Sequence, residues 1–390
     1  MTAALDVLFT FLRLGCTSFG GPVAHIGYFR KEFVERRRWL DDGVFADLVA
    51  LCQFLPGPAS SQLAFAIGRH RAGLCGAIAA SIGFTAPSAV LMILFAQGLL
   101  RWSGNTGWLH GLTVAAVAVV AHSVLQMARS LCPDAQRRGI GLLAAAAALL
   151  WPGAWGQVGS IAAGGVAGWW LYRDDIAVPD RDRAPGRHGI AAGVLVAFAV
   201  LLVTLPLATQ QFPGASLALA DSFYRAGALV FGGGHVVLPL LRAELVPPGW
   251  ISDAHFLAGY GAAQAVPGPL FTFAAYLGAA AHIGPGGWTG GLLALFAIFL
   301  PAWLLIGGAL PFWHTLRAQA WAQAALRGSN AAVVGLLLAA LITPVATEGI
   351  QSGWDAALAA GLFALLHYAR APAWLIVLLA AAGGAGLAAL

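Results

Sequence analysis

Residues 18–40, SFGGPVAHIGYFRKEFVERRRWL, interrupt an otherwise apolar chain. A Phe-Gly-Gly-Pro break comes first, and a run crowded with basic residues follows it. Pro22 is suited to the first turn of a new helix, because its ring presets the backbone angle and its missing N–H is not needed there. The stretch therefore predicts two short helices, 5–18 and 22–38, on either side of a glycine break.

The rest of the chain has the composition of a polytopic membrane protein. Of its 390 residues 59% are hydrophobic and 9% are charged, whereas a soluble domain carries roughly a quarter charged residues. Apolar runs long enough to span a bilayer recur along the chain, at 74–98, 109–128, 190–208, 286–312 and 321–345. We expect an all-α, multi-pass protein in contact with the lipid bilayer and without a sizeable soluble domain.

The motifs that the chain lacks narrow its function. There is no GxxxxGK[ST], HExxH or GxSxG motif, so neither an ATP-driven pump nor an intramembrane hydrolase is supported. The four cysteines are scattered without metal-ligand spacing. We expect no enzymatic activity, cofactor or bound metal. The net charge of +5 is the balance of 21 basic residues, 20 arginines and Lys31, against 16 acidic ones. The basic residues bear on membrane topology rather than on nucleic acid as a partner.

The opening motif recurs in the second half of the chain. FLRLGCTSFGGPVAHIGYFRKEFV (11–34) aligns with FYRAGALVFGGGHVVLPLLRAELV (223–246), and after a one-residue slip the match continues to a Pro-Gly-Pro in each half. These matches predict two homologous repeats, 1–171 and 189–390, joined by a polar cytoplasmic linker, 172–188. The register pairs Arg13 with Arg225, Gly20 and Gly21 with Gly232 and Gly233, Arg30 with Arg242, Glu32 with Glu244, Asp42 with Asp253, Gln53 with Gln264, and Pro56-Gly57-Pro58 with Pro267-Gly268-Pro269.

Each interrupted pair of helices is either one broken crossing or a re-entrant hairpin that enters and leaves on the same side. Arginine placement favours hairpins, because the main basic clusters then share one side of the membrane. Five crossings (74–98, 109–128, 139–151, 156–172 and 190–208) then separate the repeats, and an odd number inverts the second. Five basic residues lie in 30–38, but the matching 242–250 has one, as expected of a loop that has changed sides.

Inverted repeats with glycine- and proline-broken helices are typical of secondary transporters, whose substrate site lies at the repeat interface. Helices that start after Gly21, Pro58, Gly234 and Pro269 would point free N–H groups at one region, which suits an anion. Arg13 and Arg225 lie in apolar stretches and are the main candidate ligands. The alternative is that each arginine reaches the interface or pairs with Asp6 or Asp221.

For each of the other polar residues near the breaks there are two alternative roles. Gln53 and Gln264 are substrate hydrogen-bond donors or contacts between helices. Arg30 with Glu32, and Arg242 with Glu244, are functional groups or paired helix ends. His25 and His235 can titrate or donate, but they do not align with each other, which favours ordinary polar filling.

At these residues the sequence resembles the chromate ion transporter family, as a long-chain, two-domain member. The resemblance covers roughly 5–130 and 215–345 and rests on FGGPVAHI, VERRRWL, QFLPGP, RAGLCG, FGGGHVVLP and QAVPGPLFTFAAYLGA. It implies export of chromate from the bacterial cytoplasm across the inner membrane, driven by an ion gradient and conferring chromate resistance. By motif position the resemblance also implies functional roles for the residues of the two repeats that are paired in the alignment above. One departure is that Pro22 and His25 face Gly234 and Val237, so the two repeats are expected to contribute unequally.

The resulting hypothesis is an alternating-access chromate transporter with an oxyanion site at the repeat interface. Glu32, Glu244, His25 or His235 would couple transport of the oxyanion to movement of a proton or another ion. The alternatives are transport of sulfate or another oxyanion, by uptake or exchange, an anion channel, and a membrane protein that carries no flux. The sequence leaves open whether the chain forms a homodimer.

Overall fold

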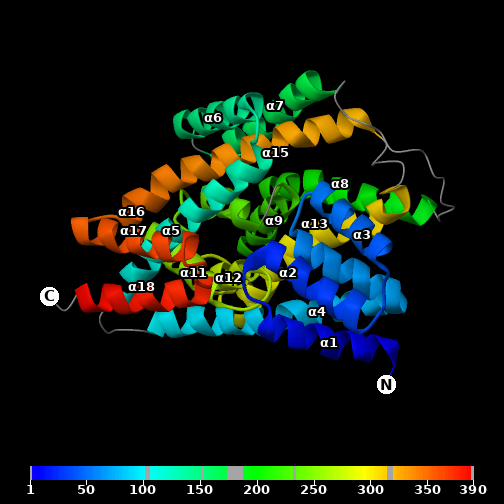
Figure 1. Ribbon diagram of the computed structural model, residues 1–390, viewed down its shortest axis with the longest axis horizontal. Coiled ribbons are helices and arrows are strands. Elements are labelled where there is room, and N and C mark those ends of the chain that lie inside the picture. Colours follow the sequence, from blue (N-terminus) through cyan, green and yellow to red (C-terminus); the bar gives the residue numbers. More distant parts are fainter. Residues whose placement is uncertain are drawn as a thin grey trace.

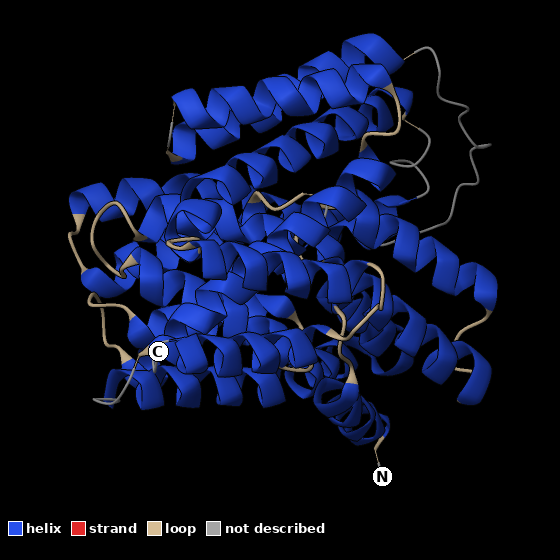
Figure 2. Ribbon diagram, turned by 60° about the vertical axis from the view of Figure 1, so that its left-hand side comes forward, coloured by secondary structure: helices blue, strands red, loops and turns tan. Residues whose placement is uncertain are grey.

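The computed structural model describes residues 2–101, 106–151, 153–173, 188–231, 234–313 and 319–387. Every regular element in these ranges is a helix and none is a strand (Figure 2), which confirms the all-α prediction. The larger helices are α1 (Ala3–Thr17), α2 (Gly21–Arg30), α3 (Asp42–Phe54), α4 (Ala59–Arg101), α5 (Gly107–Leu131), α6 (Ala135–Leu150), α7 (Ala154–Tyr172), α8 (His188–Gln211), α9 (Ala215–Ala228), α10 (Val237–Leu245), α11 (Asp253–Ala265), α12 (Phe273–Ala280), α13 (Gly287–Ala309), α15 (Ala320–Ala340), α17 (Gly353–His367) and α18 (Ala373–Leu387).

Short elements of other helix types extend several of these helices. The π-helical turn η1 (Lys31–Arg36) continues α2, and η5 (Leu341–Ala346) with α16 (Thr347–Gly349) continues α15. The 3-10 turns η2 (Gly234–Val236) and η3 (Leu270–Thr272) precede α10 and α12, and η4 (Leu310–Phe312) follows α13. The predicted helix 22–38 therefore begins at Gly21 and ends at Arg36, with Pro22 inside its first turn.

Five helices are long and apolar enough to cross a membrane: Ala59–Arg101, Gly107–Leu131, Gly189–Gln211, Gly287–Phe312 and Ala320–Gly349. They coincide with the five predicted apolar runs, which confirms a multi-pass membrane protein. The first of them is broken at Ala72 and Gly73, where the backbone leaves the helical region. Residues 59–71 and 74–101 are thus two helices, where the sequence predicted a short helix over 59–69 and a separate apolar crossing over 74–98. Gly68 packs against Gly76 between them.

Equivalent helices of the two halves pack in equivalent ways. Helix α1 lies along the second part of α4, where Gly15 meets the backbone of Gly83, and α9 lies along α13, where Gly227 meets the backbone of Ile298. A side chain at either glycine would overlap these backbone atoms. Glycine at these positions therefore permits the close approach of the helices.

The two halves also exchange their last helices. Helices α6 and α7 pack on α15 of the second half, and α17 and α18 pack on α5 of the first half (Figure 1). The closest crossings are again at small residues, with Gly328 of α15 against Gly164 and Gly168 of α7, and Gly384 of α18 against Gly111 of α5. Because each half is completed by the other, residues from both halves meet in the interior.

Candidate functional site

The chain breaks of the two halves meet through a crossed pair of backbone hydrogen bonds. The N–H of Gly57 donates to the carbonyl oxygen of Val230 at 2.7 Å, and the N–H of Gly268 donates to the carbonyl oxygen of Ser18 at 2.8 Å. Gly57 aligns with Gly268, and Ser18 aligns with Val230. Each Pro-Gly-Pro break is therefore tied to the glycine break of the opposite half, and the pattern is symmetric.

Helices begin at the glycine and proline motifs of both halves. Helix α2 begins at Gly21, α4 at Ala59, η2 at Gly234 and η3 at Leu270. The glycines take left-handed backbone angles that other residues rarely adopt, with φ of +100° at Gly20, +77° at Gly21, +118° at Gly57 and +99° at Gly268. Gly232 and Gly233, the predicted counterparts of Gly20 and Gly21, lie outside the described residues.

The prolines at the breaks cap these helix starts. The carbonyl oxygen of Pro58 accepts a hydrogen bond from the N–H of Ser61, and that of Pro269 accepts one from the hydroxyl of Thr272 at 2.8 Å. The carbonyl oxygen of Pro56 accepts from the amide of Gln62 at 2.8 Å. Pro56, Pro58, Pro267 and Pro269 are not among the residues that line the cavities described next.

Two cavities lie at the breaks. The Gln53 chamber, of about 560 Å³, is lined by Gly20, Gly21, Pro22, Gln53, Gly57, Gly234 and His235, with Ser123, Gln126, Ser130 and Asn330 among its other polar residues. The Gln264 chamber, of about 300 Å³, is lined by Gly20, Gly21, His235, Gln264 and Gly268, with His122, Ser123, Gln126 and Arg370. Gly20, Gly21, Ser123, Gln126 and His235 line both chambers, so these residues form the boundary between them.

The polar face of α5 was missed in the sequence. His122, Ser123, Gln126 and Ser130 fall within or beside a predicted apolar crossing and line the chambers. Their spacing of one, four and eight residues places them on one helix face, which is a signal that the sequence offered. Asn330 of α15 and Arg370, between α17 and α18, carry no such local signal, because neither belongs to a repeated polar pattern.

The two arginines of the apolar stretches, Arg13 and Arg225, are held in ion pairs in this conformation. Arg13 contacts Glu32 at 2.6 Å. In the second half, Arg225 makes two parallel hydrogen bonds to Glu244, at 2.8 and 2.7 Å, and a third to Asp221 at 3.1 Å. Neither arginine lines either chamber. Arg13 and Glu32 align with Arg225 and Glu244, so the same pair occurs in both halves of the chain.

A second ion pair is also repeated. Arg30 donates to Asp42 at 2.8 and 3.1 Å, and Arg242 donates to Asp253 at 2.7 and 3.1 Å. Both pairs join the end of one helix to the start of the next. The structure thus pairs Arg30 and Glu32, and Arg242 and Glu244, with other groups, and separates all four from the residues that line the chambers.

The two predicted histidines lie in different environments. His25 is fully buried, with its Nε2 3.2 Å from the carbonyl oxygen of Ser18 and its ring against that of Phe84. His235 lines both chambers, and its Nδ1 lies 2.7 Å from the hydroxyl of Tyr260. Of the two, only His235 is placed where it can meet a solute in the cavities.

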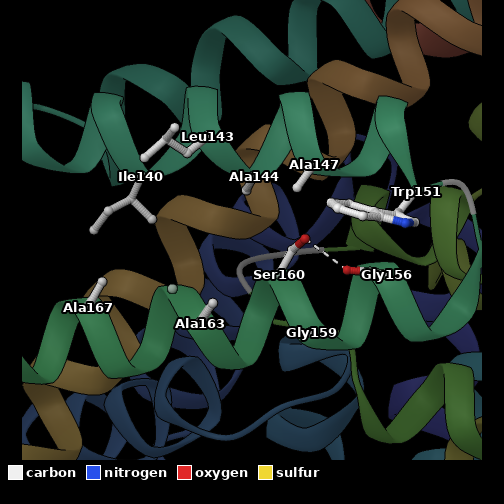
Figure 3. Close-up of a pocket in the computed structure, with 11 residues that line it drawn as sticks. Ile140, Leu143, Ala144, Ala147, Trp151, Gly156, Gly159, Ser160, Ala163 and Ala167 are labelled. Atoms are coloured by element: carbon white, nitrogen blue, oxygen red, sulfur yellow. Dashed lines mark hydrogen bonds between the residues drawn. The ribbon is translucent and has the colours of Figure 1, made fainter.

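A further groove, between α6 and α7, has a different chemical character. Figure 3 shows it lined by small and aliphatic side chains with Trp151 at one end. Its one hydroxyl, on Ser160, is bonded to the carbonyl oxygen of Gly156 at 2.8 Å. Apart from the indole N–H of Trp151, the side chains that line this groove offer a polar solute no free donor. Across the described residues, no three His, Cys, Asp or Glu side chains are grouped so as to hold a metal ion.

The fold and the cavities together define a class: an all-α, multi-pass membrane protein whose interrupted helices enclose internal polar chambers. The model of the family described as chromate transporter matches the chain twice, over residues 5–169 and 217–387. The chain therefore belongs to the chromate transporter family.

Named relatives agree with this assignment. The chain is 30% identical to the chromate transport protein of Pseudomonas aeruginosa, over 96% of this chain and 90% of that one. It is 29% identical to the chromate transport protein of Cupriavidus metallidurans, over 85% and 80% of the two chains. Uncharacterized transporter YwrA of Bacillus subtilis is 31% identical over 92% of its length but only 42% of this chain. No solved structure matches.

Proposed function

We propose that this protein is a secondary transporter that moves chromate across the cytoplasmic membrane, out of the cell. Two relatives that cover most of the chain are named chromate transport proteins. Chromate is a tetrahedral dianion, and hydrogen-bond donors in a partly dehydrated cavity suit its oxygens. Sulfate has the same shape and charge, and is the alternative substrate of the same site.

The observation that carries the proposal is the crossed pair of hydrogen bonds between the breaks. Gly57 binds Val230, Gly268 binds Ser18, and a chamber lies beside each Pro-Gly-Pro break. Non-helical backbone at membrane depth is tolerated where it is buried in protein or lines a cavity. In our proposal the repeats are inverted and the breaks are tips of re-entrant hairpins. The two chambers then become the routes to opposite sides of the membrane.

In the same mechanism, Arg13 and Arg225 would bind the oxyanion after their ion pairs open. Arg225 and Arg13 are engaged by Glu244 and Glu32 in the conformation described. For either arginine to bind the oxyanion directly, its ion pair would open in another conformation, and the glutamate released could take up a proton. We propose this exchange as the link between chromate movement and a proton gradient.

Flux of chromate and sulfate into proteoliposomes, with and without a pH gradient, tests the function. A transporter gives saturable flux that depends on the gradient, and a channel gives unsaturable, electrogenic flux. The absence of flux for both oxyanions would refute the proposal. Arg13→Ala and Arg225→Ala are each expected to abolish the effect of the gradient, and unchanged coupling in both variants would exclude these arginines from the mechanism.

A further inference from the structure

The two chambers differ in charge. The Gln264 chamber has Arg370 in its lining, whereas no arginine, lysine or carboxylate is among the lining residues of the Gln53 chamber. The Gln264 chamber likewise has no carboxylate in its lining. A dianion that moves through both chambers is therefore held more strongly on the Gln264 side, because a net positive charge in a partly dehydrated site attracts it.

Arg370 is not committed to another group. Among the described residues its guanidinium has no hydrogen-bond or ion-pair partner, in contrast to Arg13 and Arg225. The residue is exposed and precedes α18, and its backbone takes φ of +52°, a conformation that is uncommon outside glycine. Because Arg370 is both exposed and part of the chamber lining, its guanidinium lies where the chamber opens to solvent and can contact an anion from solution.

Two buried donors face no partner in the same chamber. The side-chain nitrogen Nε2 of Gln264 is buried without a hydrogen bond, and so is Nδ1 of His122. Nε2 of His122 lies 2.8 Å from the amide nitrogen of Gln126, which can only donate. The neutral imidazole then carries its proton on Nδ1. Both orphan atoms are thus N–H donors, and a buried donor without a partner is costly.

We propose that the Gln264 chamber is the oxyanion-binding site, with the Arg370 guanidinium, the His122 Nδ1–H and the Gln264 amide as its donors. The inference rests on the proposed function and adds the ligands to it. The chamber's volume of about 300 Å³ exceeds that of one tetrahedral oxyanion and leaves room for waters of about 30 Å³ each. Because the lining contains Arg370 and no carboxylate, the site favours an anion over a cation.

The site is asymmetric between the repeats. Gln53, the counterpart of Gln264, lines the other chamber, which contains no cation. His122 and Arg370 come from α5 and from the segment between α17 and α18, which pack together across the two halves. The oxyanion is therefore bound once per chain, in a position completed by both repeats.

Equilibrium binding of radiolabelled chromate to the purified full-length protein in detergent, at fixed ionic strength, tests the site. Arg370→Gln is expected to raise Kd roughly tenfold or more, because a charge-assisted hydrogen bond is lost. Arg370→Lys should recover part of the affinity. Gln264→Leu removes an uncharged donor and should raise Kd roughly fivefold. Sulfate should compete in the wild-type protein.

Arg38→Gln is the matched control. Arg38 is exposed, has φ of +50° and has no hydrogen-bond or ion-pair partner among the described residues, but it lines neither chamber. Its loss should leave Kd within about twofold, because an exposed charge at a distance is screened. If the wild-type protein transports chromate and Arg370→Gln binds it as tightly as Arg38→Gln, the site is wrong and the function stands. If the wild-type protein neither binds nor transports either oxyanion, both proposals fail.

Discussion

The N–H of Gly57 donates a 2.7 Å hydrogen bond to the carbonyl oxygen of Val230, a residue of the other half of the chain. Gly268 and Ser18 repeat the contact in the opposite direction at 2.8 Å. Each break thus satisfies a backbone group that the interruption of a helix leaves unpaired. The two bonds join the halves at glycines that line the chambers, so we expect the geometry of the breaks to affect both stability and transport.

Gly57→Ala and Gly268→Ala should each destabilise the protein. The backbone at these glycines has φ of +118° and +99°, and a Cβ at Gly57 would lie 2.9 Å from the Gln62 amide nitrogen. A strained backbone of this kind costs about 1–3 kcal/mol, so the unfolding temperature in detergent should fall. Gly98→Ala is the control, because a Cβ there meets no atom within 4 Å. An unfolding temperature for Gly57→Ala equal to that of the control would contradict the argument.

Loss of Arg225 should cost more stability than loss of the equivalent Arg13. Glu244 is 12% exposed and Arg225 is its one ion-pair partner among the described residues, whereas Glu32 keeps Arg36 and Arg37 when Arg13 is removed. Arg225→Gln then leaves a largely buried carboxylate without an ion-pair partner, at a cost of about 3 kcal/mol. Arg13 is 45% exposed, and its pair is worth less than about 1 kcal/mol. The unfolding temperatures of Arg225→Gln and Arg13→Gln at neutral pH test this difference. Equal decreases in unfolding temperature would refute the prediction that loss of Arg225 is the more destabilising.

Asp134 should stabilise the protein only above its depressed pKa. Burial opposes ionisation, but hydrogen bonds from the Arg137 N–H, the Arg137 side chain and the Tyr172 hydroxyl lower the pKa of Asp134 from 3.8 to about 2. The ionised form is favoured by folding, so this stability is present above pH 4 and is lost as the pH falls towards 2. Asp134→Asn should unfold at a lower temperature than the wild type at pH 6, with a gap that narrows below pH 4. A gap independent of pH would exclude this linkage.

If the two repeats are inverted, equivalent loops lie on opposite faces of the membrane, and a reagent that cannot cross the membrane should label them from opposite faces. Arg38 and Gly249 are equivalent by alignment, and both have left-handed backbone angles after the second helix of their repeat. Single cysteines at Arg38 and at the exposed neighbour Pro248, introduced into a protein with its four native cysteines replaced by serine, should react with an impermeant maleimide from opposite faces of the membrane. Reaction of both cysteines from the same face would refute inversion.

The sequence alone determined the helices, their breaks and their repetition. These features are local: apolar runs predict crossings, and glycine and proline interrupt them through backbone angles that their neighbours do not change. The match between Pro56-Gly57-Pro58 and Pro267-Gly268-Pro269 also followed from residue identity. The predicted ends of the helix 22–38, which α2 and η1 together form, were wrong by one or two residues, because helix ends depend on capping groups that the pattern does not specify.

Tertiary structure decided which polar groups are free and which are paired. Arg13 and Arg225 stood out in the sequence as charges in apolar surroundings, but carboxylates 19 residues further along the chain engage both of them. Arg370 was unremarkable in the sequence and lines a chamber with His122, from a helix more than 200 residues away. Such pairings depend on how α5 packs with α17 and α18 across the two halves, and contacts between distant segments leave no periodic signal in the chain.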